Sequence, residues 1–486
     1  MIEQCQKTAL ILLLLAATAI ASPAQVFTTL ANFNGNNGAA PSYVNLAQGL
    51  DGSLYGTTAE GGSNNLGTTF KITPEGVLTT LYNFCSQPDC SDGFYPESGL
   101  VLGNDGNFYG TTAEGGGLSC PVSPGCGTLF AMSPAGTLTS FYDFCIQVDC
   151  ADGELPQAAL IQAANGNFYG TTPTGGGTAC HVYGCGIIFE ITPEGSMTTL
   201  YTFNHADGAK PDGPLIQSID GNLYGTTAAG GPDGDLGTIF KITPRGILTI
   251  AHGFAAGHGT SPFAGLVQAS DNNFYGTTLW GGSGNGTIFR MTPAGTLKTL
   301  HDFNRTDGSG ARAHLIQGTD GSLYGTTTFG GDLSCNPPFG CGTVFKITLA
   351  GKLATLHSFE STDGAFPAGG LIQATNGIFY GTTSTGGDLN CLAPVGCGTV
   401  FSLSTGLGPF VTFVRRADRV GQTFGILGQG LTGTTSVSLN GAPASFTVVS
   451  DTFIKATVPA GATTGLVTVT TPSGTLTSNV PFHVIP

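Results

Sequence analysis

The tetrapeptide Tyr-Gly-Thr-Thr occurs seven times in this chain of 486 residues, and its spacing constrains the fold more than any other feature. Successive copies lie 49 to 60 residues apart, and they begin at Tyr55, Tyr109, Tyr169, Tyr224, Tyr275, Tyr324 and Tyr380. Internal periodicity of this length is typical of solenoids, propellers and other repeat arrays. The chain is therefore predicted to contain one structural unit seven times.

Each unit carries the signals of four short antiparallel strands. In the sixth unit the predicted strands are Leu315–Gln317, Leu323–Thr327, Gly342–Thr348 and Leu353–Phe359, with an Asp-Gly hairpin turn between the first two. No part of the unit has the 3.6-residue period of an amphipathic helix. The pattern predicts an all-β fold, and seven four-stranded units indicate a seven-bladed β-propeller.

The two ends of the repeat region indicate that the units form a ring. The seventh unit ends after its third strand, near Leu403, whereas Val26–Phe33 (VFTTLANF) at the other end nearly copies Val77–Phe84 (VLTTLYNF). A linear solenoid has no reason to divide one unit between its ends. In a ring, the N-terminal strand can complete the last sheet and remove an exposed edge. We therefore predict a propeller over residues 25–406 that is closed by an N-terminal strand.

The start of the chain has the pattern of an export signal. Lys7 precedes an apolar run from Ala9 to Ala21, and small residues that suit cleavage follow. We predict that residues 1–24 are a secretory signal peptide and that the mature protein is secreted or held at the cell surface. No other segment is long and apolar enough to span a membrane, so we expect no membrane span.

The cysteines become interpretable once export is predicted. Apart from Cys5, twelve cysteines fall into six pairs whose members are five or six positions apart. Disulfides persist in oxidising compartments, so six local disulfides are the simplest interpretation. Metal binding is the less favoured alternative, because zinc sites usually pair cysteines two to four residues apart. The predicted disulfides are Cys85/Cys90, Cys120/Cys126, Cys145/Cys150, Cys180/Cys185, Cys335/Cys341 and Cys391/Cys397.

A different pattern begins near residue 407, where the Tyr-Gly-Thr-Thr repeat ceases. Short alternating strands follow one another, and Asn440-Gly441 and Ser473-Gly474 mark turns between them. About 80 residues of strands with turns every 8 to 12 residues are typical of a small β-sandwich. We predict an immunoglobulin-like domain over residues 407–486.

Two family resemblances accompany this organisation. The units, with Leu-Ile-Gln, Asp-Gly-x-Leu/Phe-Tyr-Gly-Thr-Thr, Gly-Thr-x-Phe and Thr-Leu-x-x-Leu-x-x-Phe in order, resemble the GloVer-type tandem repeats of exported bacterial proteins. The C-terminal segment resembles IPT/TIG domains through Gly428–Leu431, Val437–Gly441 and Val458–Gly461. The resemblances imply a secreted or surface repeat protein with an appended immunoglobulin-like module. Neither brings catalytic residues that can be transferred to this chain.

Charge and motifs narrow the function classes. Fifteen Lys and Arg residues oppose thirty Asp and Glu residues, which gives a net charge of −15. A protein of this charge does not hold a polyanion by counterion release, so we expect no nucleic-acid partner, and an anionic membrane surface is disfavoured. The sequence also contains no HExxH, no GxSxG and no phosphate-binding glycine loop. We therefore favour a protein that is not an enzyme.

The loops indicate which face of the propeller is functional. The loops between the second and third strands of each unit lie on the same face as the crossovers between units. All six cysteine pairs and the large length differences fall in these loops, whereas the other face consists of tight turns. Binding usually resides in variable loops on a rigid scaffold. We therefore predict that the disulfide-stapled face is the functional surface.

One set of candidate ligand-binding residues precedes the Gly-Gly pair that follows Tyr-Gly-Thr-Thr. Trp280 and Phe329 occupy this position in neighbouring units and are predicted to form an aromatic platform for a sugar ring or a peptide. Partial packing against the next loop is the alternative role for such aromatic residues. Glu60 and Glu114 occupy the same position in the first two units and are also predicted to contact a ligand.

A second set lies in the crossovers, where most units place an aspartate before a glycine: Asp92, Asp152, Asp207, Asp307 and Asp363. The favoured interpretation is an Asx turn that shapes each crossover. The alternative is a ring of carboxylates that binds Ca²⁺, which takes six to eight oxygen ligands. Asp152 and Asp207 are in addition predicted to contact a ligand.

These inferences predict an exported, monomeric, non-enzymatic binding scaffold without a cofactor. Its expected partner is a polysaccharide or a surface or extracellular protein, recognised through the stapled face. One alternative is a carbohydrate-active hydrolase or lyase that uses a pair of crossover carboxylates. Another is a purely structural surface or adhesion element.

Overall fold

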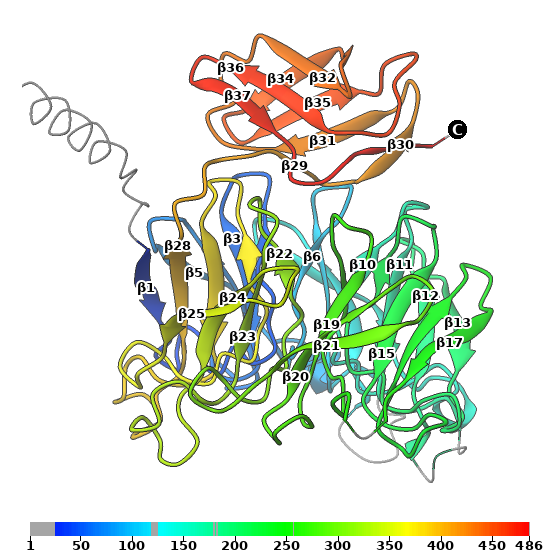
Figure 1. The fold of residues 1–486 in the computed structure, drawn as a ribbon, viewed down its shortest axis with the longest axis vertical. Helices are drawn as coiled ribbons and strands as arrows, with labels where there is room; N and C mark the ends of the chain where they lie inside the picture. Colours follow the sequence, from blue (N-terminus) through cyan, green and yellow to red (C-terminus); the bar gives the residue numbers. More distant parts are fainter. Residues whose placement is uncertain (1–24, 118–124, 178–179, 181–182, 256, 486) are drawn as a thin grey trace, which may run out of the picture.

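The computed structural model describes residues 25–117, 125–177, 180, 183–255 and 257–485 (Figure 1). The predicted signal peptide and Cys120 lie outside the described residues. The described chain is built from β-strands, with two short 3₁₀ turns, η1 (Pro88–Cys90) and η2 (Val148–Cys150). No helix among these residues has the length and apolar character needed to cross a membrane. The prediction of an all-β protein is confirmed.

The repeat region of the described chain forms seven four-stranded antiparallel sheets, which we number in chain order. Sheet 1 contains β2 (Ala47–Gln48), β3 (Leu54–Thr58), β4 (Thr68–Ile72) and β5 (Leu78–Asn83). Sheet 2 contains β6 (Val101–Leu102), β7 (Phe108–Thr112), β8 (Thr128–Met132) and β9 (Leu138–Asp143). Sheet 3 contains β10 (Ile161–Gln162), β11 (Phe168–Thr172), β12 (Ile187–Ile191) and β13 (Met197–Thr202). Sheet 4 contains β14 (Ile216–Gln217), β15 (Leu223–Thr227), β16 (Thr238–Ile242) and β17 (Leu248–Gly253).

The later sheets repeat the same order. Sheet 5 contains β18 (Val267–Gln268), β19 (Phe274–Thr278), β20 (Thr287–Met291) and β21 (Leu297–Asp302). Sheet 6 contains β22 (Ile316–Gln317), β23 (Leu323–Thr327), β24 (Thr343–Ile347) and β25 (Leu353–Ser358). Sheet 7 contains β26 (Ile372–Gln373), β27 (Phe379–Thr383) and β28 (Thr399–Ser404), and its fourth strand is β1 (Val26–Asn32) from the other end of the chain.

The strand β1 runs antiparallel to β28, as Figure 1 shows. Val26 pairs with Ser404 and Asn32 pairs with Thr399, across more than 360 residues of sequence. The apolar core continues across this junction, because Leu54 and Phe70 of sheet 1 belong to the same buried cluster as Tyr380 and Val400 of sheet 7.

The Tyr-Gly-Thr-Thr strand is completely buried in every sheet, and each of its residues has a packing role. The Tyr55 ring lies 4.1 Å from the Phe108 ring of the next sheet. A Cβ at Gly56 would lie 2.7 Å from the Phe70 ring, so only glycine leaves room for that aromatic residue. The hydroxyl of Thr57 donates a 2.9 Å hydrogen bond to the Ser98 carbonyl, which precedes the first strand of sheet 2. The repeated motif therefore joins consecutive sheets.

Residues after 407 form a separate sandwich. One sheet has the order β29 (Thr412–Phe413), β31 (Thr423–Leu427), β35 (Phe453–Thr457) and β34 (Phe446–Ser450). The other has the order β33 (Ala442–Pro443), β32 (Ser436–Leu439), β36 (Val467–Thr471) and β37 (Gly474–Thr477). In addition, β30 (Ala417–Arg419) pairs in parallel with β38 (His483–Ile485). Both sheets contribute to one apolar core, which includes Ile426, Val437 and Val469.

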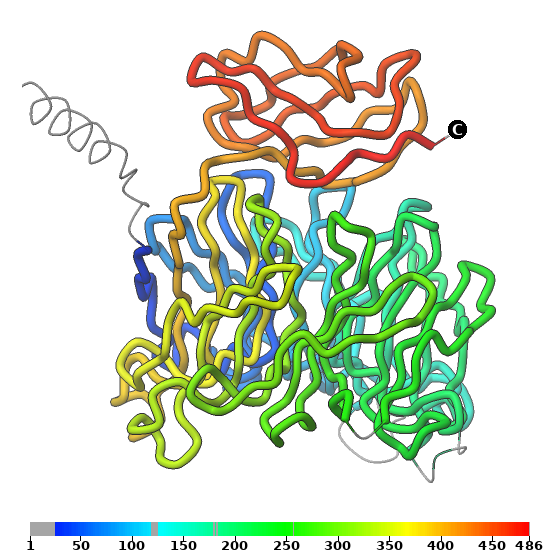
Figure 2. The backbone as a smooth tube through the Cα atoms, in the orientation of Figure 1, coloured from blue at the N-terminus to red at the C-terminus, as the bar shows by residue number. Residues whose placement is uncertain are grey.

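The sandwich sits against the tight turns at one end of the repeat region (Figures 1 and 2). The Thr452 hydroxyl donates a 2.6 Å hydrogen bond to the Leu50 carbonyl in the first hairpin turn of sheet 1. Nη2 of Arg415 donates to the Ala164 carbonyl of sheet 3 at 2.8 Å. The backbone N–H of Phe410 donates to the Thr375 carbonyl of sheet 7 at 3.0 Å. The loops at the opposite end of the repeat region are therefore not covered by the sandwich.

Candidate functional site

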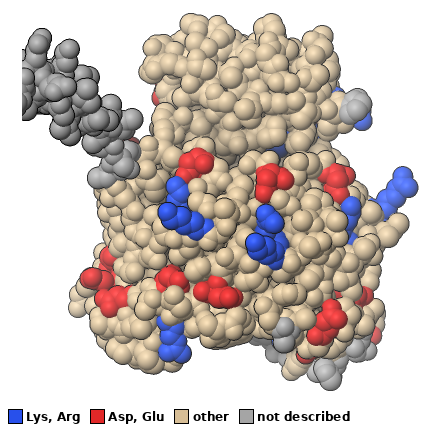
Figure 3. Space-filling view, viewed as in Figure 1, with Lys and Arg blue, Asp and Glu red and all other residues tan. Residues whose placement is uncertain are grey.

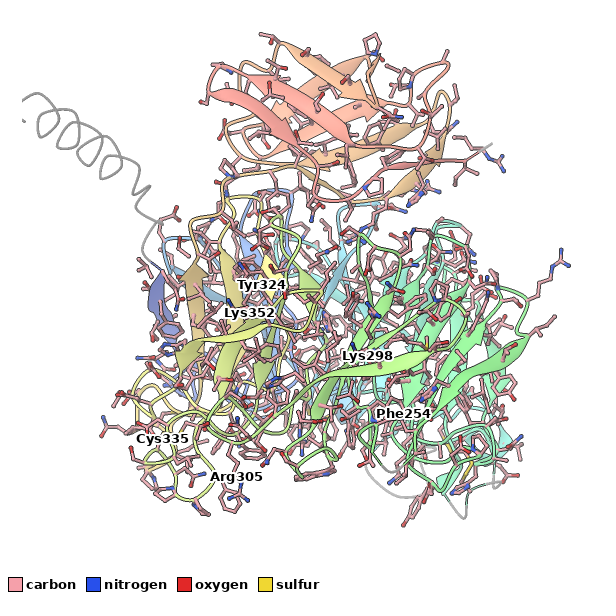
Figure 4. The ribbon with its side chains drawn as sticks, viewed as in Figure 1. Phe254, Lys298, Arg305, Tyr324, Cys335 and Lys352 are labelled. Carbon is pink, nitrogen blue, oxygen red and sulfur yellow. A yellow bond between two sulfur atoms is a disulfide. The ribbon has the colours of Figure 1, made fainter. Side chains whose placement is uncertain are left out.

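The loops at the end of the repeat region away from the sandwich form what we call the stapled face. Among the described residues it consists of the loops between the second and third strands and the crossovers between sheets: residues 33–46, 59–67, 84–100, 113–117, 125–127, 144–160, 173–177, 180, 183–186, 203–215, 228–237, 254–255, 257–266, 279–286, 303–315, 328–342, 359–371 and 384–398. Cys335 and Arg305 of this face are labelled at the lower end of the molecule in Figure 4.

Disulfides close several of these loops. Five of the six predicted bonds are present among the described residues: Cys85–Cys90, Cys145–Cys150, Cys180–Cys185, Cys335–Cys341 and Cys391–Cys397. Cys126 is also disulfide-bonded, and its predicted partner Cys120 lies outside the described residues. Such bonds form and persist in oxidising compartments, which is consistent with an extracellular protein.

Apolar side chains are exposed at the tips of the disulfide-closed loops. Among the described residues, the exposed large apolar residues inside these loops are Ile146, Val148, Tyr183, Phe339, Leu392 and Val395, and each exposes more than half of its surface. Val148 is 84% exposed. A disulfide restrains the backbone of such a loop, so the loop keeps these residues at the surface. The stapled face therefore presents fixed apolar contacts to solvent.

The stapled face is also strongly acidic. Its loops contain seventeen Asp and Glu residues and three Lys and Arg residues, out of thirty and fifteen in the whole chain. In Figure 3, acidic side chains form a broken row across the lower part of the molecule, whereas most basic side chains lie above that row. The charge of the protein is therefore concentrated at one end, where it attracts cations and cationic surfaces.

The crossover aspartates accept hydrogen bonds that shape their own loops. Asp92 accepts from the backbone N–H groups of Ser86 and Gln87, and Asp152 accepts from those of Ile146 and Gln147. Asp152 is completely buried and Asp92 is 3% exposed. The donors lie five and six positions before each aspartate, whereas the donor in an Asx turn lies two positions after it, so these aspartates fix their crossovers by a different set of bonds from the one predicted.

The other three crossover aspartates repeat this arrangement. Asp207, Asp307 and Asp363 each accept one hydrogen bond of 2.9 or 3.0 Å from a backbone N–H three positions earlier. The crossover aspartates thus lie in separate loops and are engaged locally.

A second partner of each crossover aspartate comes from the fourth strand, and sequence reasoning missed it. The hydroxyls of Tyr82, Tyr142 and Tyr201 donate to Asp92, Asp152 and Asp207 at 2.6 to 2.8 Å. Burial and the Asp207 carboxylate raise the pKa of Tyr201 to about 12. In later units histidine replaces tyrosine: Nε2 of His301 lies 3.0 Å from Asp307, and Nε2 of His357 lies 2.9 Å from Asp363. The sequence signal for this contact was the tyrosine or histidine that recurs in the fourth strand, six or ten positions before each of these aspartates.

The residues that precede the Gly-Gly pair all join their loop to a crossover. Each forms an isolated antiparallel bridge with a crossover residue, and the bridged residues are Glu60, Glu114, Thr174, Ala229, Trp280, Phe329 and Thr385. Trp280 is 48% exposed. Phe329 packs its ring 5.5 Å from Phe366 and 6.3 Å from Phe339, and only part of it is accessible. Of the two residues predicted to form the aromatic platform, Trp280 is therefore the more exposed to solvent.

A set of variable side chains, which we call the pre-strand set, precedes the first strands, three positions before a leucine that recurs in every unit: Tyr43, Glu97, Gln157, Asp212, Phe263, Arg312 and Ala368. Nη1 of Arg312 donates to the Tyr43 hydroxyl at 2.6 Å, and its guanidinium lies 5.9 Å from the Phe263 ring centre. Nε2 of Gln157 donates to Glu97 at 2.7 Å. The bond between Arg312 and Tyr43 joins units that are distant in sequence, whereas Gln157 and Glu97 belong to consecutive units. Sequence reasoning did not single these residues out.

Burial shifts the pKa of three groups in or beside the pre-strand set. It raises the pKa of Asp212 to about 7, although Lys210 and Arg312 oppose the shift. It lowers the pKa of His314 to about 4. Burial also raises the pKa of Glu97, with a smaller contribution from the charges of Glu114 and Glu60. Glu60 and Glu114 thus lie within electrostatic range of Glu97.

One described group of residues has the composition of a metal site. The sulfur atoms of Cys126, Cys145 and Cys150 and a carboxylate oxygen of Glu154 lie within 4.8 Å of one another. All three cysteines are disulfide-bonded, and zinc binds thiolates rather than disulfide sulfurs. This group therefore does not fit a metal centre in the oxidised protein.

Comparison with known proteins identifies both parts of the chain. The family model described as Gloeobacter/Verrucomicrobia repeat matches residues 18–181, 122–270 and 218–442. The IPT/TIG domain model matches residues 416–484. No curated protein matches the sequence.

Similar solved structures include two gluconolactonase-type proteins. A putative gluconolactonase is 13% identical, with a TM-score of 0.39, over 80% of this chain and 94% of its own. A gluconolactonase from Xanthomonas campestris is 14% identical, with a TM-score of 0.38, over 65% of this chain and 90% of its own. A protein of unknown function from Bacteroides thetaiotaomicron is 12% identical, with a TM-score of 0.42, over 78% and 76% of the two chains. At these TM-scores the likenesses carry no argument about activity.

Proposed function

The chain belongs to the Gloeobacter/Verrucomicrobia repeat family and ends in an IPT/TIG domain, and we propose that it is an exported scaffold that binds another extracellular protein through the stapled face. The observation that carries this proposal is the set of apolar side chains exposed at the tips of disulfide-closed loops. Large apolar side chains that variable loops on a rigid scaffold leave exposed are suited to binding a partner.

The kind of apolar residue favours a protein over a polysaccharide. Four of the six exposed tip residues are aliphatic: Ile146, Val148, Leu392 and Val395. Sugar rings stack on flat aromatic faces, whereas aliphatic side chains pack into the apolar core of a protein interface. Loops that are already ordered also lose little conformational entropy on binding. A protein partner therefore makes the best use of these contacts.

We further propose that the seven sheets are the blades of a closed seven-bladed β-propeller, which holds the stapled loops on one rigid face. Two kinds of contact support closure. First, β1 completes the sheet of β26 to β28. Second, the side chain of Gln48 in sheet 1 donates to the Thr375 hydroxyl at 2.9 Å and accepts from the Thr375 backbone N–H at 3.0 Å. A propeller also leaves only short sheet edges, one at the outer strand of each blade.

The position of the IPT/TIG domain fits this function. Its contacts lie on the tight turns at Leu50, Ala164 and Thr375, so the stapled face is free to meet a partner. In this arrangement the immunoglobulin-like domain and the stapled loops point to opposite ends of the molecule (Figure 1).

The proposal is tested by polar substitution of the loop tips. The tip variant combines Ile146→Ser, Val148→Ser, Leu392→Ser and Val395→Ser. The control combines Val77→Ser and Ile247→Ser, which are 62% and 65% exposed and lie outside the stapled face. Each protein is immobilised and exposed to envelope proteins of the cell that produces it, before and after trypsin treatment of the extract. We expect the tip variant to retain about one tenth of the bound protein or less, because apolar anchors carry most interface energy.

The control variant is expected to bind as the unmodified protein does. Equal binding by the tip variant would refute the stapled face as the binding surface. Binding that survives trypsin treatment of the extract would refute a protein partner and identify a polysaccharide instead.

A further inference from the structure

A groove lies between the crossovers that follow sheets 1 and 2. Its volume is about 560 Å³. The residues that line it come from β5, from β9 and from the two crossovers: Tyr82, Gln87, Ser91, Asp92, Leu138, Ser140, Phe141, Tyr142, Asp143 and Ile146. Disulfides fix both of its walls, because Cys85–Cys90 closes one crossover and Cys145–Cys150 closes the other. The groove is therefore bounded by two ordered loops of the stapled face.

The lining of the groove combines an apolar floor with an acid. Leu138, Phe141 and Tyr142 come from one strand, β9, which ends at Asp143. On the rim, Ile146 is 59% exposed, and Val148 of the same loop is 84% exposed. The groove thus offers aromatic and aliphatic surface that leads to a carboxylate.

The two acids of the groove, Asp92 and Asp143, differ in how many hydrogen bonds their carboxylates already accept. Asp92 is buried, and its oxygens accept from Tyr82, Ser86 and Gln87. Asp143 is partly accessible and accepts a hydrogen bond from the backbone N–H of Gly117. A carboxylate has about four acceptor positions, so Asp143 has capacity for a further donor beyond those that the described residues supply. Burial raises the pKa of Asp143, and a cation placed beside it would offset that desolvation.

We propose that this groove receives a basic side chain, arginine in particular, from the protein partner. This inference rests on the proposed function and names the chemistry of one contact. The aliphatic stem packs on Leu138 and Phe141, the guanidinium lies over the aromatic rings, and its N–H groups donate to Asp143. Arginine suits this lining better than lysine, because its planar guanidinium stacks on aromatic faces and binds carboxylates with two parallel hydrogen bonds. The acidic stapled face attracts such a partner from a distance.

The test measures binding of a fluorescent hexa-arginine peptide by anisotropy, with a hexa-citrulline peptide as the neutral counterpart. The main variant is Asp143→Asn, and its matched control is Asp302→Asn. Asp302 occupies the same strand position in sheet 5, opposite Thr287 as Asp143 is opposite Thr128, so both variants lose one charge at equivalent sites. We expect Asp143→Asn to weaken hexa-arginine binding about fivefold and Asp302→Asn to weaken it less than about twofold.

A second pair of variants does not remove any packed side chain. Ser91→Lys places a positive charge on the exposed rim of the groove, and Thr362→Lys places one at the equivalent exposed position of the last crossover. We expect Ser91→Lys to weaken binding about fivefold and Thr362→Lys to have a small effect. The groove proposal would be overturned if the groove variant and its control weakened hexa-arginine binding equally in both pairs. It would also be overturned if hexa-citrulline bound as tightly as hexa-arginine. Loss of partner capture by the tip variant in that case would leave the proposed function standing.

Discussion

The hydroxyl of Thr382 donates a 3.2 Å hydrogen bond to the Pro41 carbonyl, which joins sheet 7 to the segment that leads into sheet 1. The first threonine of every Tyr-Gly-Thr-Thr copy likewise donates to a backbone carbonyl of the segment that leads into the next sheet, at one of two positions in that segment, and the other donors are Thr57, Thr111, Thr171, Thr226, Thr277 and Thr326. The contact between the last and the first unit thus has the same chemistry as the contacts between consecutive units.

We therefore predict that loss of this hydrogen bond destabilises the protein equally at the junction of sheets 7 and 1 and between two consecutive sheets. Thr382→Val and Thr326→Val each remove a buried donor of similar shape, so each is expected to lower the free energy of unfolding by about 1 to 2 kcal/mol. Thermal and urea unfolding of the two variants measures this. If only Thr326→Val destabilised the protein, sheets 1 and 7 would not be joined in solution.

Removal of the strand β1 is expected to leave the edge of β28 unpaired. A protein that begins at residue 35 should unfold at a lower temperature than one that begins at residue 25, and it should associate, because an exposed edge pairs with other chains. Size-exclusion chromatography with light scattering measures the association. Addition of a peptide of residues 25–34 should restore the monomer, and failure to restore it would argue against a replaceable edge strand.

The bond between Tyr142 and Asp152 is expected to stabilise the disulfide-closed crossover. Tyr142→Phe removes a 2.8 Å donor from a completely buried carboxylate, which should cost about 1 to 3 kcal/mol of unfolding free energy. Tyr183→Phe is the control, because Tyr183 is 53% exposed in another disulfide-closed loop. Urea unfolding at neutral pH compares the two variants, and equal stabilities would show that the buried bond contributes nothing.

The raised pKa of Asp212 predicts that stability falls as pH rises. The folded state holds this proton up to about pH 7, whereas the unfolded state releases it near the ordinary value of 3.8. The folded form therefore binds more protons between these values, and the ionised side chain costs up to about 4 kcal/mol at higher pH. Asp212→Asn should stabilise the protein at pH 8 and change little at pH 4.

The control for this pH dependence is Asp89→Asn, which alters an exposed acid of the same face. Thermal unfolding at pH 4, 6 and 8 separates the two variants. The same stability difference at all three values for Asp212→Asn would contradict a shifted titration at this site.

Much of the fold was predictable because its signals are local and repeated. The Asp-Gly and Pro-x-Gly turns delimit strands within a few residues, and the predicted Leu353–Phe359 differs from the observed β25 (Leu353–Ser358) by one residue. The strand Val26–Phe33, which completes the seventh sheet, was recognisable because its sequence nearly copies the fourth strand of the first unit. Cysteines five or six positions apart likewise predicted their partners, since no other cysteine is near in sequence.

The candidate site was less predictable, because its contacts join residues that are distant in sequence. Arg312 meets Tyr43 across 269 positions, and no local pattern distinguishes these residues from other polar loop positions. The roles of His301 and His357 were also missed: in isolation each resembles a packing variant of tyrosine, and only the folded crossover shows the aspartate beside it. Likewise, the groove exists only because two crossovers of adjacent sheets lie side by side.

By itself, the sequence determined the repeating unit, the divided seventh sheet, the paired cysteines and the acidic character of the loops, because each of these follows from the chemistry of neighbouring residues. Only the tertiary structure decided that the sandwich rests on the turns, that Phe329 is packed while Trp280 is open, and which acids retain hydrogen-bonding capacity. The physical reason is that exposure and free acceptor positions depend on what the rest of the chain places around a side chain, and its own sequence neighbours do not specify that.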